Sequence, residues 1–406
     1  MLRFATSPTA DMNLNNLRVA LFNHLIAQEK KEDLIVRIED TNKEKNIDGK
    51  DQEILDTLGL FGISYSQVIY QSESVRFHSA MALQLMHEKK AFSCFCSPSW
   101  IEKKQEESQL ADEVYTYDDA CRNLPAELVI DNTSPFTIRI VKPDNSPVDS
   151  FTIMNKEKIP TYDFSSAVDD MLNNISLVIR SNEYIDATPK QEHIRKSLNY
   201  DKKIEYVHIT TLDKVPSVKH LLEEGFLPQA ISNYLISTGN TTPKNIFTLE
   251  EAKEWFTLDT LSSNPVLFDI KILREINKEH LKLLDAKELS RYVGFADTEI
   301  GELARVYLED GVATTRELKA KIAPIFSKRD IPKFLCEKAE ILKKIIRNAP
   351  YFDKYEDFKN YVSKESGLQE DEFLETLCVL LTNAQEVPDI AIVYKYLKNY
   401  IGEIVK

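Results

Sequence analysis

The fold is decided near the N-terminus, where residues 2–18 read Leu2-Arg3-Phe4-Ala5-Thr6-Ser7-Pro8-Thr9-Ala10-Asp11-Met12-Asn13-Leu14-Asn15-Asn16-Leu17-Arg18. Leu2 and Phe4 alternate as on a buried strand, Pro8 and Thr9 interrupt it, and leucines then recur at helical spacing up to Leu25. A strand, a turn and a helix start of this kind are typical of a phosphate site, because the helix N-terminus offers unpaired N–H donors. A first strand–helix unit that binds nothing fits the same pattern.

Strands and helices alternate up to about residue 185. Residues 34–40 form the clearest strand, which ends in Glu39 and Asp40. This carboxylate pair indicates either a ligand site at the sheet edge or the cap of a helix. Helical patterns dominate from about residue 187 onward. We therefore expect an α/β front, with an insertion between about residues 84 and 160, followed by an all-helical back.

Composition narrows the class of protein. The net charge of −14 over 406 residues argues against a wholly basic nucleic-acid binder, although a local basic face stays possible. Apolar runs stay well short of the roughly 18 residues of a membrane span, and the first residues do not resemble a signal peptide. The odd number of cysteines, five, does not suggest a disulfide framework. We expect a soluble, cytoplasmic protein with no membrane association.

The insertion contains three cysteines, Cys94, Cys96 and Cys121, with Tyr117 four residues before the last. The spacing suggests a tetrahedral zinc site whose fourth ligand is Tyr117 or water. Small buried hydrophobic side chains are the alternative. The remaining cysteines, Cys336 and Cys378, lie on apolar faces of helical patterns and are expected to be core residues.

Charged residues stand at both ends of the expected strands. Arg3, Glu39 and Arg180 could hold a zwitterion, with arginine for its carboxylate and glutamate for its ammonium group, or could form a structural ion pair. A second set of charges follows late in the chain and indicates either a solvated face or a phosphate-binding face. It comprises Lys328, Arg329, Lys333, Lys338, Lys343, Lys344 and Arg347.

The motifs along nearly the whole chain resemble those of bacterial glutamyl-tRNA synthetases, which are class I aminoacyl-tRNA synthetases. The matching segments include Arg3-Phe4-Ala5-Thr6-Ser7-Pro8-Thr9, Arg37-Ile38-Glu39-Asp40-Thr41, Pro160-Thr161-Tyr162, Val168-Asp169-Asp170, Val178-Ile179-Arg180, Thr188-Pro189-Lys190 and Leu380-Leu381-Thr382-Asn383. The resemblance implies an α/β Rossmann-type catalytic domain with an α+β insertion, followed by an all-α C-terminal half. It implies a glutamate site formed by Arg3, Ser7, Glu39, Tyr162 and Arg180. It also favours a zinc ion held by Cys94, Cys96, Tyr117 and Cys121.

The resemblance further implies a division of the chain. Residues 1–83 and 161–186 are expected to form the two halves of the Rossmann domain, with a trimmed acceptor-end-binding insertion at 84–160. Residues 187–295 correspond to a stem-contact region, and residues 296–406 to a helical anticodon-binding-like domain. Transfer RNA and glutamate are then the expected partners of a monomeric protein.

Two signatures of this enzyme class depart from the family pattern. The HIGH-type motif, which contacts ATP, falls on Asn13, Leu14, Asn15 and Asn16. The KMSKR-type loop is expected between His208 and Lys219. The segment there is shorter than in the family and contains no KMSKR-like run of residues. The insertion also looks trimmed between Lys142 and Asp149.

These departures bear on the chemistry, because adenylate formation depends on charge stabilisation of phosphate oxygens. The sequence thus predicts a divergent paralogue with impaired or lost aminoacylation, a pseudoenzyme that keeps the binding scaffold. An active glutamate–tRNA ligase with unorthodox signatures, using ATP and magnesium, is one alternative. A regulatory or structural interaction protein is the other.

Overall fold

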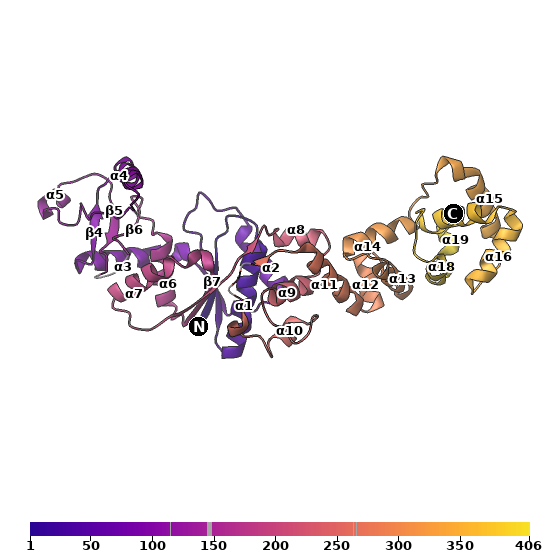
Figure 1. The fold of residues 1–406 in the computed structure, drawn as a ribbon, viewed down its shortest axis with the longest axis horizontal. Coiled ribbons are helices and arrows are strands. Elements are labelled where there is room, and N and C mark those ends of the chain that lie inside the picture. The colour runs from indigo at the N-terminus through magenta and orange to yellow at the C-terminus, as the bar shows by residue number, and fades with distance from the viewer. Residues whose placement is uncertain (114, 144–147, 263, 265) are drawn as a thin grey trace. The chain divides into compact units, whose positions relative to one another are not determined.

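The computed structural model describes residues 1–406 except residues 114, 144–147, 263 and 265 (Figure 1). The chain forms two compact units. The first comprises Met1–Val218, Thr238–Pro243 and Leu249–Phe268, and the second comprises Lys219–Ser237, Lys244–Thr248 and Asp269–Lys406.

The first unit is built on a five-stranded parallel sheet with the strand order β3-β2-β1-β7-β8. Its strands are β1 (Leu2–Thr6), β2 (Leu34–Ile38), β3 (Gln67–Tyr70), β7 (Leu177–Ser181) and β8 (Glu205–Ile209). The chain runs outward from β1 to β3 and later returns to the other side of β1 through β7. The order of the strands therefore reverses beside β1, and this is where ligands gather in open α/β sheets.

Helices connect these strands as the sequence predicts. They are α1 (Leu14–Lys30), α2 (Lys50–Leu60), α3 (Val75–His87), α6 (Tyr162–Leu172) and α7 (Ala187–Ser197). Every residue of β2 is buried, as expected for a parallel strand covered on both faces. The α/β Rossmann-type prediction for this part of the chain is confirmed.

The insertion adds an antiparallel sheet with the order β4-β5-β6. Its elements are β4 (Ala91–Cys94), α4 (Pro98–Leu110), α5 (Ala126–Ile130), β5 (Thr137–Ile140) and β6 (Thr152–Met154). Ile138, Ile140 and Ile153 share one hydrophobic core with Phe164 and Ile194 from α6 and α7. The stretch expected to be trimmed, between Lys142 and Asp149, includes residues 144–147, which lie outside the described residues.

Three sequence expectations need correction. The strand β8 lies at residues 205–209, within the part of the chain that the pattern presented as mainly helical. The helical pattern of the sequence extends over residues 249–256, but the structure forms a helix only at α10 (Leu249–Ala252). Cys336 is exposed rather than a core residue, because it occupies the first position of a helix, and Cys378 is half-buried.

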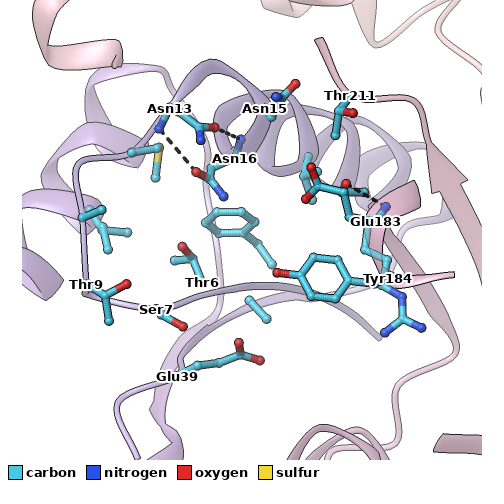
Figure 2. Close-up of a pocket in the computed structure, with 18 of the residues that line it drawn as sticks. Thr6, Ser7, Thr9, Asn13, Asn15, Asn16, Glu39, Glu183, Tyr184 and Thr211 are labelled. Carbon is cyan, nitrogen blue, oxygen red and sulfur yellow. Dashed lines mark hydrogen bonds between the residues drawn. The ribbon is translucent and has the colours of Figure 1, made fainter. Parts of the chain in front are cut away.

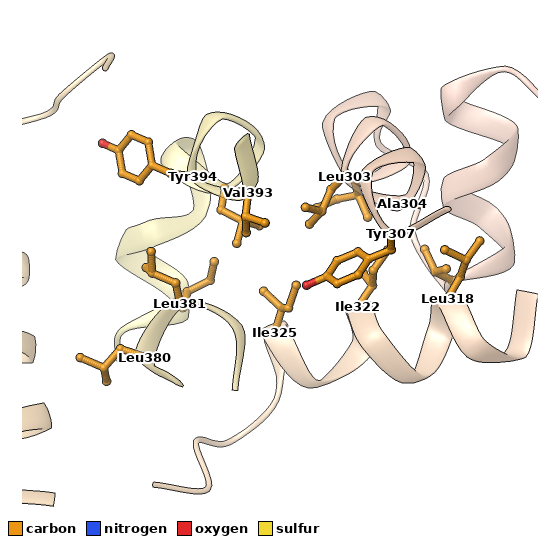
Figure 3. Packing of buried hydrophobic residues seen from close by; sticks show 14 of the residues in the cluster. Leu303, Ala304, Tyr307, Leu318, Ile322, Ile325, Leu380, Leu381, Val393 and Tyr394 are labelled. Atoms are coloured by element: carbon orange, nitrogen blue, oxygen red, sulfur yellow. The ribbon is translucent and has the colours of Figure 1, made fainter. Parts of the chain in front are cut away.

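The second unit is helical. It contains α9 (Pro228–Ser237), α11 (Ile270–Leu283), α12 (Ala286–Tyr292), α13 (Thr298–Glu309), α14 (Thr315–Ile322), α15 (Cys336–Asn348), α16 (Tyr355–Ser366), α17 (Glu370–Thr382), α18 (Ile390–Leu397) and α19 (Ile401–Ile404), with α8 (Val218–Glu223) at its start. Figure 3 shows part of its core, where Leu303 and Tyr307 of α13 pack near Ile325 and Val393. Gly301 permits the contact between α12 and α13, since a Cβ there would overlap the carbonyl group of Ala286. The predicted all-α C-terminal half is confirmed.

Candidate functional site

A cavity of about 330 Å³ lies at the carboxyl ends of β1 and β7, beside the N-terminus of α1 (Figure 2). It brings together residues as far apart in the chain as Arg3 and Thr211. All five residues expected to hold glutamate line it, namely Arg3, Ser7, Glu39, Tyr162 and Arg180. Asn13, Asn15 and Asn16 line it too, whereas Leu14 is fully buried in the core.

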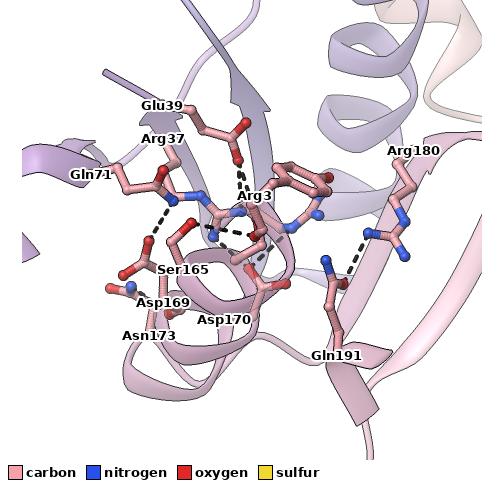
Figure 4. A network of polar contacts seen from close by, with 12 residues as sticks. Arg3, Arg37, Glu39, Gln71, Ser165, Asp169, Asp170, Asn173, Arg180 and Gln191 are labelled. Atoms are coloured by element: carbon pink, nitrogen blue, oxygen red, sulfur yellow. Dashed lines mark hydrogen bonds and ion pairs between the residues drawn. The ribbon is translucent and has the colours of Figure 1, made fainter. Parts of the chain in front are cut away.

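One side of the cavity rests on a buried ionic network (Figure 4). The Asp170 carboxylate accepts hydrogen bonds from Arg3 Nε at 3.3 Å and from Arg37 Nη1 at 2.6 Å. Arg37 also donates to Glu39 Oε1 at 3.2 Å. Burial alone would raise the pKa of Asp170, but the two guanidinium groups outweigh it and lower the pKa. Arg3 is thus already paired with an acid, and Glu39 is held at the cavity wall.

Arg180, at the end of β7, has a different environment. Its side chain is 4% exposed and donates to Gln191 Oε1 at 3.0 Å and to Thr188 Oγ1 at 2.8 Å. Its Nε lies 3.4 Å from His208 Nε2. No carboxylate of the described residues forms an ion pair with it. Burial lowers the pKa of Arg180, which is the effect expected of a buried cation without an acidic partner.

Aromatic and hydroxyl groups complete this half of the cavity. The rings of Tyr162 and Tyr184 lie 5.2 Å apart between their centroids, and Ser7 is exposed at the rim. The carboxylates of Asp11 and Glu183 line the cavity as well, but the five residues expected to hold glutamate offer two guanidinium groups, one carboxylate and hydroxyl groups. This set matches the charges of a small amino acid with an acidic side chain.

The other half of the cavity is formed by the start of α1. Asn13 caps the helix: its side chain accepts from the Asn16 N–H at 2.9 Å, and the Asn16 side chain accepts from the Asn13 N–H at 3.3 Å. This reciprocal pair is a capping box. Asn13 and Asn16 at the HIGH-type positions thus bond to each other's backbone, as Figure 2 shows.

The segment after β8, where the KMSKR-type loop is expected, lies against the same helix end. The Asn15 amide donates to Leu212 O at 3.0 Å and accepts from Leu212 N at 2.8 Å. Val218 N donates to Met12 O at 2.9 Å, and Asn13 pairs with Ser217 in an antiparallel bridge. We call residues 210–218 the strap. The Asn15 side chain holds one end of the strap, and backbone pairing with Met12 and Asn13 holds the other.

The three thiols expected to bind a metal come together in the insertion. Cys94, Cys96 and Cys121 place their sulfur atoms within 4.8 Å of one another. Tyr117 Oη lies 3.3 Å from Cys94 Sγ and 3.5 Å from Cys96 Sγ. Soft sulfur donors with one phenol oxygen fit zinc in number and kind.

The charge of this thiol cluster is balanced by Arg139. Its Nε donates to Cys94 Sγ at 3.4 Å, and its guanidinium lies 4.0 Å from the centre of the Tyr117 ring. Burial opposes ionisation of Cys94, but hydrogen bonds from Tyr117, the Cys96 backbone and Arg139 lower its pKa to about 7. For Cys96, burial dominates and raises the pKa to about 12.

The late basic residues do not form one free surface. Lys338 pairs with Glu372 and Lys343 with Glu340, both at 2.8 Å. Arg329 donates to backbone carbonyl groups, including Ile325 O at 2.6 Å. Lys328, Lys333 and Lys344 are exposed. These three are the members of the set best placed to meet a phosphate.

Sequence reasoning missed several residues that shape the cavity. They are Arg37, Asp170, Thr188, Gln191 and His208. Arg37, Asp170 and Thr188 stood in matching motifs, which was the available signal. Gln191 carried none, because its contact with Arg180 depends on how α7 packs beside β7.

The comparisons with known proteins identify the class. A family model described as tRNA synthetases class I (E and Q), catalytic domain, matches residues 1–275. Glutamate–tRNA ligase 2 of Sulfurimonas denitrificans is 55% identical, and glutamate–tRNA ligase 1 of Nitratiruptor sp. is 42% identical, each with 100% of both chains covered. The crystal structure of a glutamate tRNA ligase from Elizabethkingia meningosepticum in complex with its amino acid shares the fold. Its TM-score is 0.80 at 18% identity, over 100% of this chain and 98% of that one.

These matches define a class I tRNA synthetase, a class that uses ATP and magnesium. The chain belongs to the glutamate–tRNA ligase family. Within the described part of the chain, no helix combines the length and the apolar character needed to cross a membrane.

Proposed function

We propose that this protein is a glutamate-binding member of the glutamate–tRNA ligase family in which activation of glutamate by ATP is impaired. The observation that carries the first half is Arg180, a buried cation whose partners Gln191, Thr188 and His208 are uncharged. A buried charge is costly unless it is paired, so the site favours an anionic ligand. A glutamate carboxylate supplies that anion.

The remaining groups fix the orientation of the ligand. The carboxylate of Glu39, which is held by Arg37, accepts hydrogen bonds from the ammonium group of the amino acid. Arg3 and the hydroxyl groups of Ser7 and Tyr162 contact the rest of the molecule. The rings of Tyr162 and Tyr184 exclude water from one side of it.

The second half of the proposal rests on the start of α1. Activation is attack of the glutamate carboxylate on the α-phosphate of ATP, which needs donors and positive charge around the phosphate oxygens. Asn13, Asn15 and Asn16 carry no charge, and their amide groups bond to α1 and to the strap. The alignments with the two relatives extend over 433 positions, more than the 406 residues of this chain. The excess supports the view that some segments of the relatives are missing from this chain.

The scaffold for tRNA is proposed to follow the family arrangement. Residues 84–160 would contact the acceptor end, residues 187–295 the stem and residues 296–406 the anticodon region. Transfer RNA is thus the second partner, and a protein that has lost activation would bind tRNA without charging it.

An active glutamate–tRNA ligase is the second candidate. It is favoured by 55% identity, over the full length of both chains, to a protein named glutamate–tRNA ligase 2. In that case ATP and magnesium are required, and other donors replace the HIGH-type and KMSKR-type groups.

Charging of total tRNA with labelled glutamate, ATP and magnesium separates the two candidates. Each lost phosphate donor typically lowers the rate by about 100- to 1,000-fold, so we expect a rate at least about 10⁴-fold below that of a glutamate–tRNA ligase assayed in parallel. Turnover comparable with that control would overturn the impairment. Calorimetry tests the pocket itself: wild-type protein should bind glutamate, and Arg180→Ala should not. Absence of both glutamate and tRNA binding would instead favour an interaction protein.

We also propose that Cys94, Cys96, Tyr117 and Cys121 hold one structural zinc ion, which would fix the insertion. Metal analysis of the purified protein should find about one zinc per chain, and Cys121→Ser should lower this content. Cys336→Ser, at an exposed cysteine outside the cluster, is the matched control and should retain the metal. Zinc-free wild-type protein that takes up no added zinc would refute the assignment.

A further inference from the structure

Gln191 lies beneath the cavity, where it contacts Arg180 (Figure 4). We propose that Gln191 is a specificity-determining residue, which selects glutamate over glutamine by leaving the charge of Arg180 uncompensated. This inference rests on the proposed glutamate site and deepens it. Gln191 acts through Arg180, so it is a positioning residue and not a ligand contact.

The orientation of the Gln191 amide follows from the donors around it. Arginine has N–H donors and no acceptor, so the amide oxygen must face Arg180 Nη1, at 3.0 Å. The Gln191 side chain is 0% exposed, and its Nε2 has no hydrogen-bond partner. A buried amide nitrogen without a partner destabilises a fold.

A glutamate at position 191 would avoid that unpaired group. It has the same shape, accepts from Arg180 with either oxygen and would form a buried ion pair. For the stability of the folded protein, glutamate would therefore be favoured over glutamine at position 191. What glutamine provides is a neutral acceptor that fixes the guanidinium in place.

The other contacts of Arg180 are neutral as well. The Thr188 hydroxyl accepts from Arg180 Nη2 at 2.8 Å and donates to His208 Nε2 at 3.1 Å. Because His208 Nε2 acts as an acceptor, the proton of its ring is on Nδ1 and the ring is uncharged. Three of the five N–H donors of Arg180 thus meet uncharged acceptors.

Arg3 and Arg37 provide an internal comparison. Both donate to the Asp170 carboxylate, so their charge is compensated within the protein. Arg180 lies in the wall of the same cavity without such a partner among the described residues. One guanidinium group in the cavity wall is thus left for an external anion. The side chain of glutamate carries such a negative charge, whereas the side chain of glutamine does not.

The test compares Gln191→Glu with Gln191→Met by calorimetry with glutamate and with glutamine, together with thermal unfolding. Gln191→Glu should raise the unfolding midpoint yet lower glutamate affinity by about 100-fold or more, because Arg180 is then paired internally. Gln191→Met, which is neutral, should lower the midpoint but retain the preference for glutamate. A purely structural role would lower stability and affinity together.

The outcomes are distinct. Wild-type affinity for glutamate in Gln191→Glu would overturn the assignment, and so would loss of the glutamate preference in Gln191→Met, even if Gln191→Glu does not fold. Wild-type protein that binds no glutamate would overturn the proposed function and this assignment with it. If the wild-type protein binds glutamate and neither variant changes this binding, the role assigned to Gln191 is overturned and the proposed function is not.

Discussion

Asp170 is a single carboxylate that serves two arginines. It is fully buried on α6 and accepts from both Arg3 and Arg37. Arg37 in turn holds Glu39, and burial, which would lower the pKa of Arg37, is outweighed by Asp170 and Glu39, so that the pKa is raised. Removing the carboxylate therefore affects the cavity wall as well as the core.

We expect Asp170→Asn to lower the free energy of unfolding by about 3–5 kcal/mol, because it leaves the buried Arg3 without an acidic partner and Arg37 with Glu39 alone. Urea unfolding measures this change. Glu107→Gln removes a carboxylate from an exposed pair with Lys104 and serves as the control, with no measurable change expected. Similar midpoints for the two variants would contradict the role assigned to Asp170.

The Asp170 carboxylate also makes the stability of the folded protein depend on pH. The pKa of Asp170 is lower in the folded state than in the unfolded chain, where it is ordinary. Its stabilisation is then complete above the ordinary pKa of aspartate, about 4, and is lost as the pH falls through the lower folded-state pKa. The wild-type protein should lose more stability than Asp170→Asn on acidification below about pH 4.

How far the sequence predicts this site depends on the kind of contact. Arg3, Glu39 and Arg180 stand at strand ends, and parallel strands bring their carboxyl ends to one edge, so their meeting in one cavity could be expected. The pairing of Arg37 with Asp170 joins residues 133 positions apart through the packing of α6 on the sheet. No local pattern encodes such a contact.

At the scale of elements, the start of α1 and the strap form one unit of structure. Asn15→Ala removes two hydrogen bonds to Leu212, each worth about 1 kcal/mol, so hydrogen exchange in residues 210–218 should become about 10- to 30-fold faster. Mass spectrometry of exchange locates the change. Asn16→Ala, one position further along, weakens only the capping box and should leave exchange in the strap unchanged. Equal effects of both variants would show that the helix cap, and not Asn15, holds the strap.

The sequence predicts elements with strong local patterns well. It does not predict β8, which lacks such a pattern. Of its five residues, Glu205–Ile209, the first is exposed, the next three are partly buried and only the last is buried. A short strand at a sheet edge lacks the continuous apolar run that marked β2. It becomes a strand because it pairs with β7, a contact that periodicity cannot reveal.

At the scale of the whole molecule, the net charge of −14 opposes the binding of tRNA. Two polyanions repel each other, so binding must depend on local cations that displace counterions from the tRNA. Lys328, Lys333 and Lys344 are exposed on the second unit, whereas Lys338 and Lys343 are paired with acids. The sequence listed these residues as one set, and only the structure separates them.

We therefore expect the triple variant Lys328→Ala, Lys333→Ala, Lys344→Ala to bind tRNA more weakly and with less dependence on salt. Each lost phosphate contact should reduce the slope of log affinity against log salt by about 0.7–0.9. Filter binding over a range of salt concentrations measures the slope. Lys359→Ala removes a lysine already paired with Glu370 at 2.9 Å and should leave the slope unchanged. If the triple variant keeps the wild-type slope, phosphate contacts lie elsewhere on the molecule, and the late basic residues only solvate the helical surface.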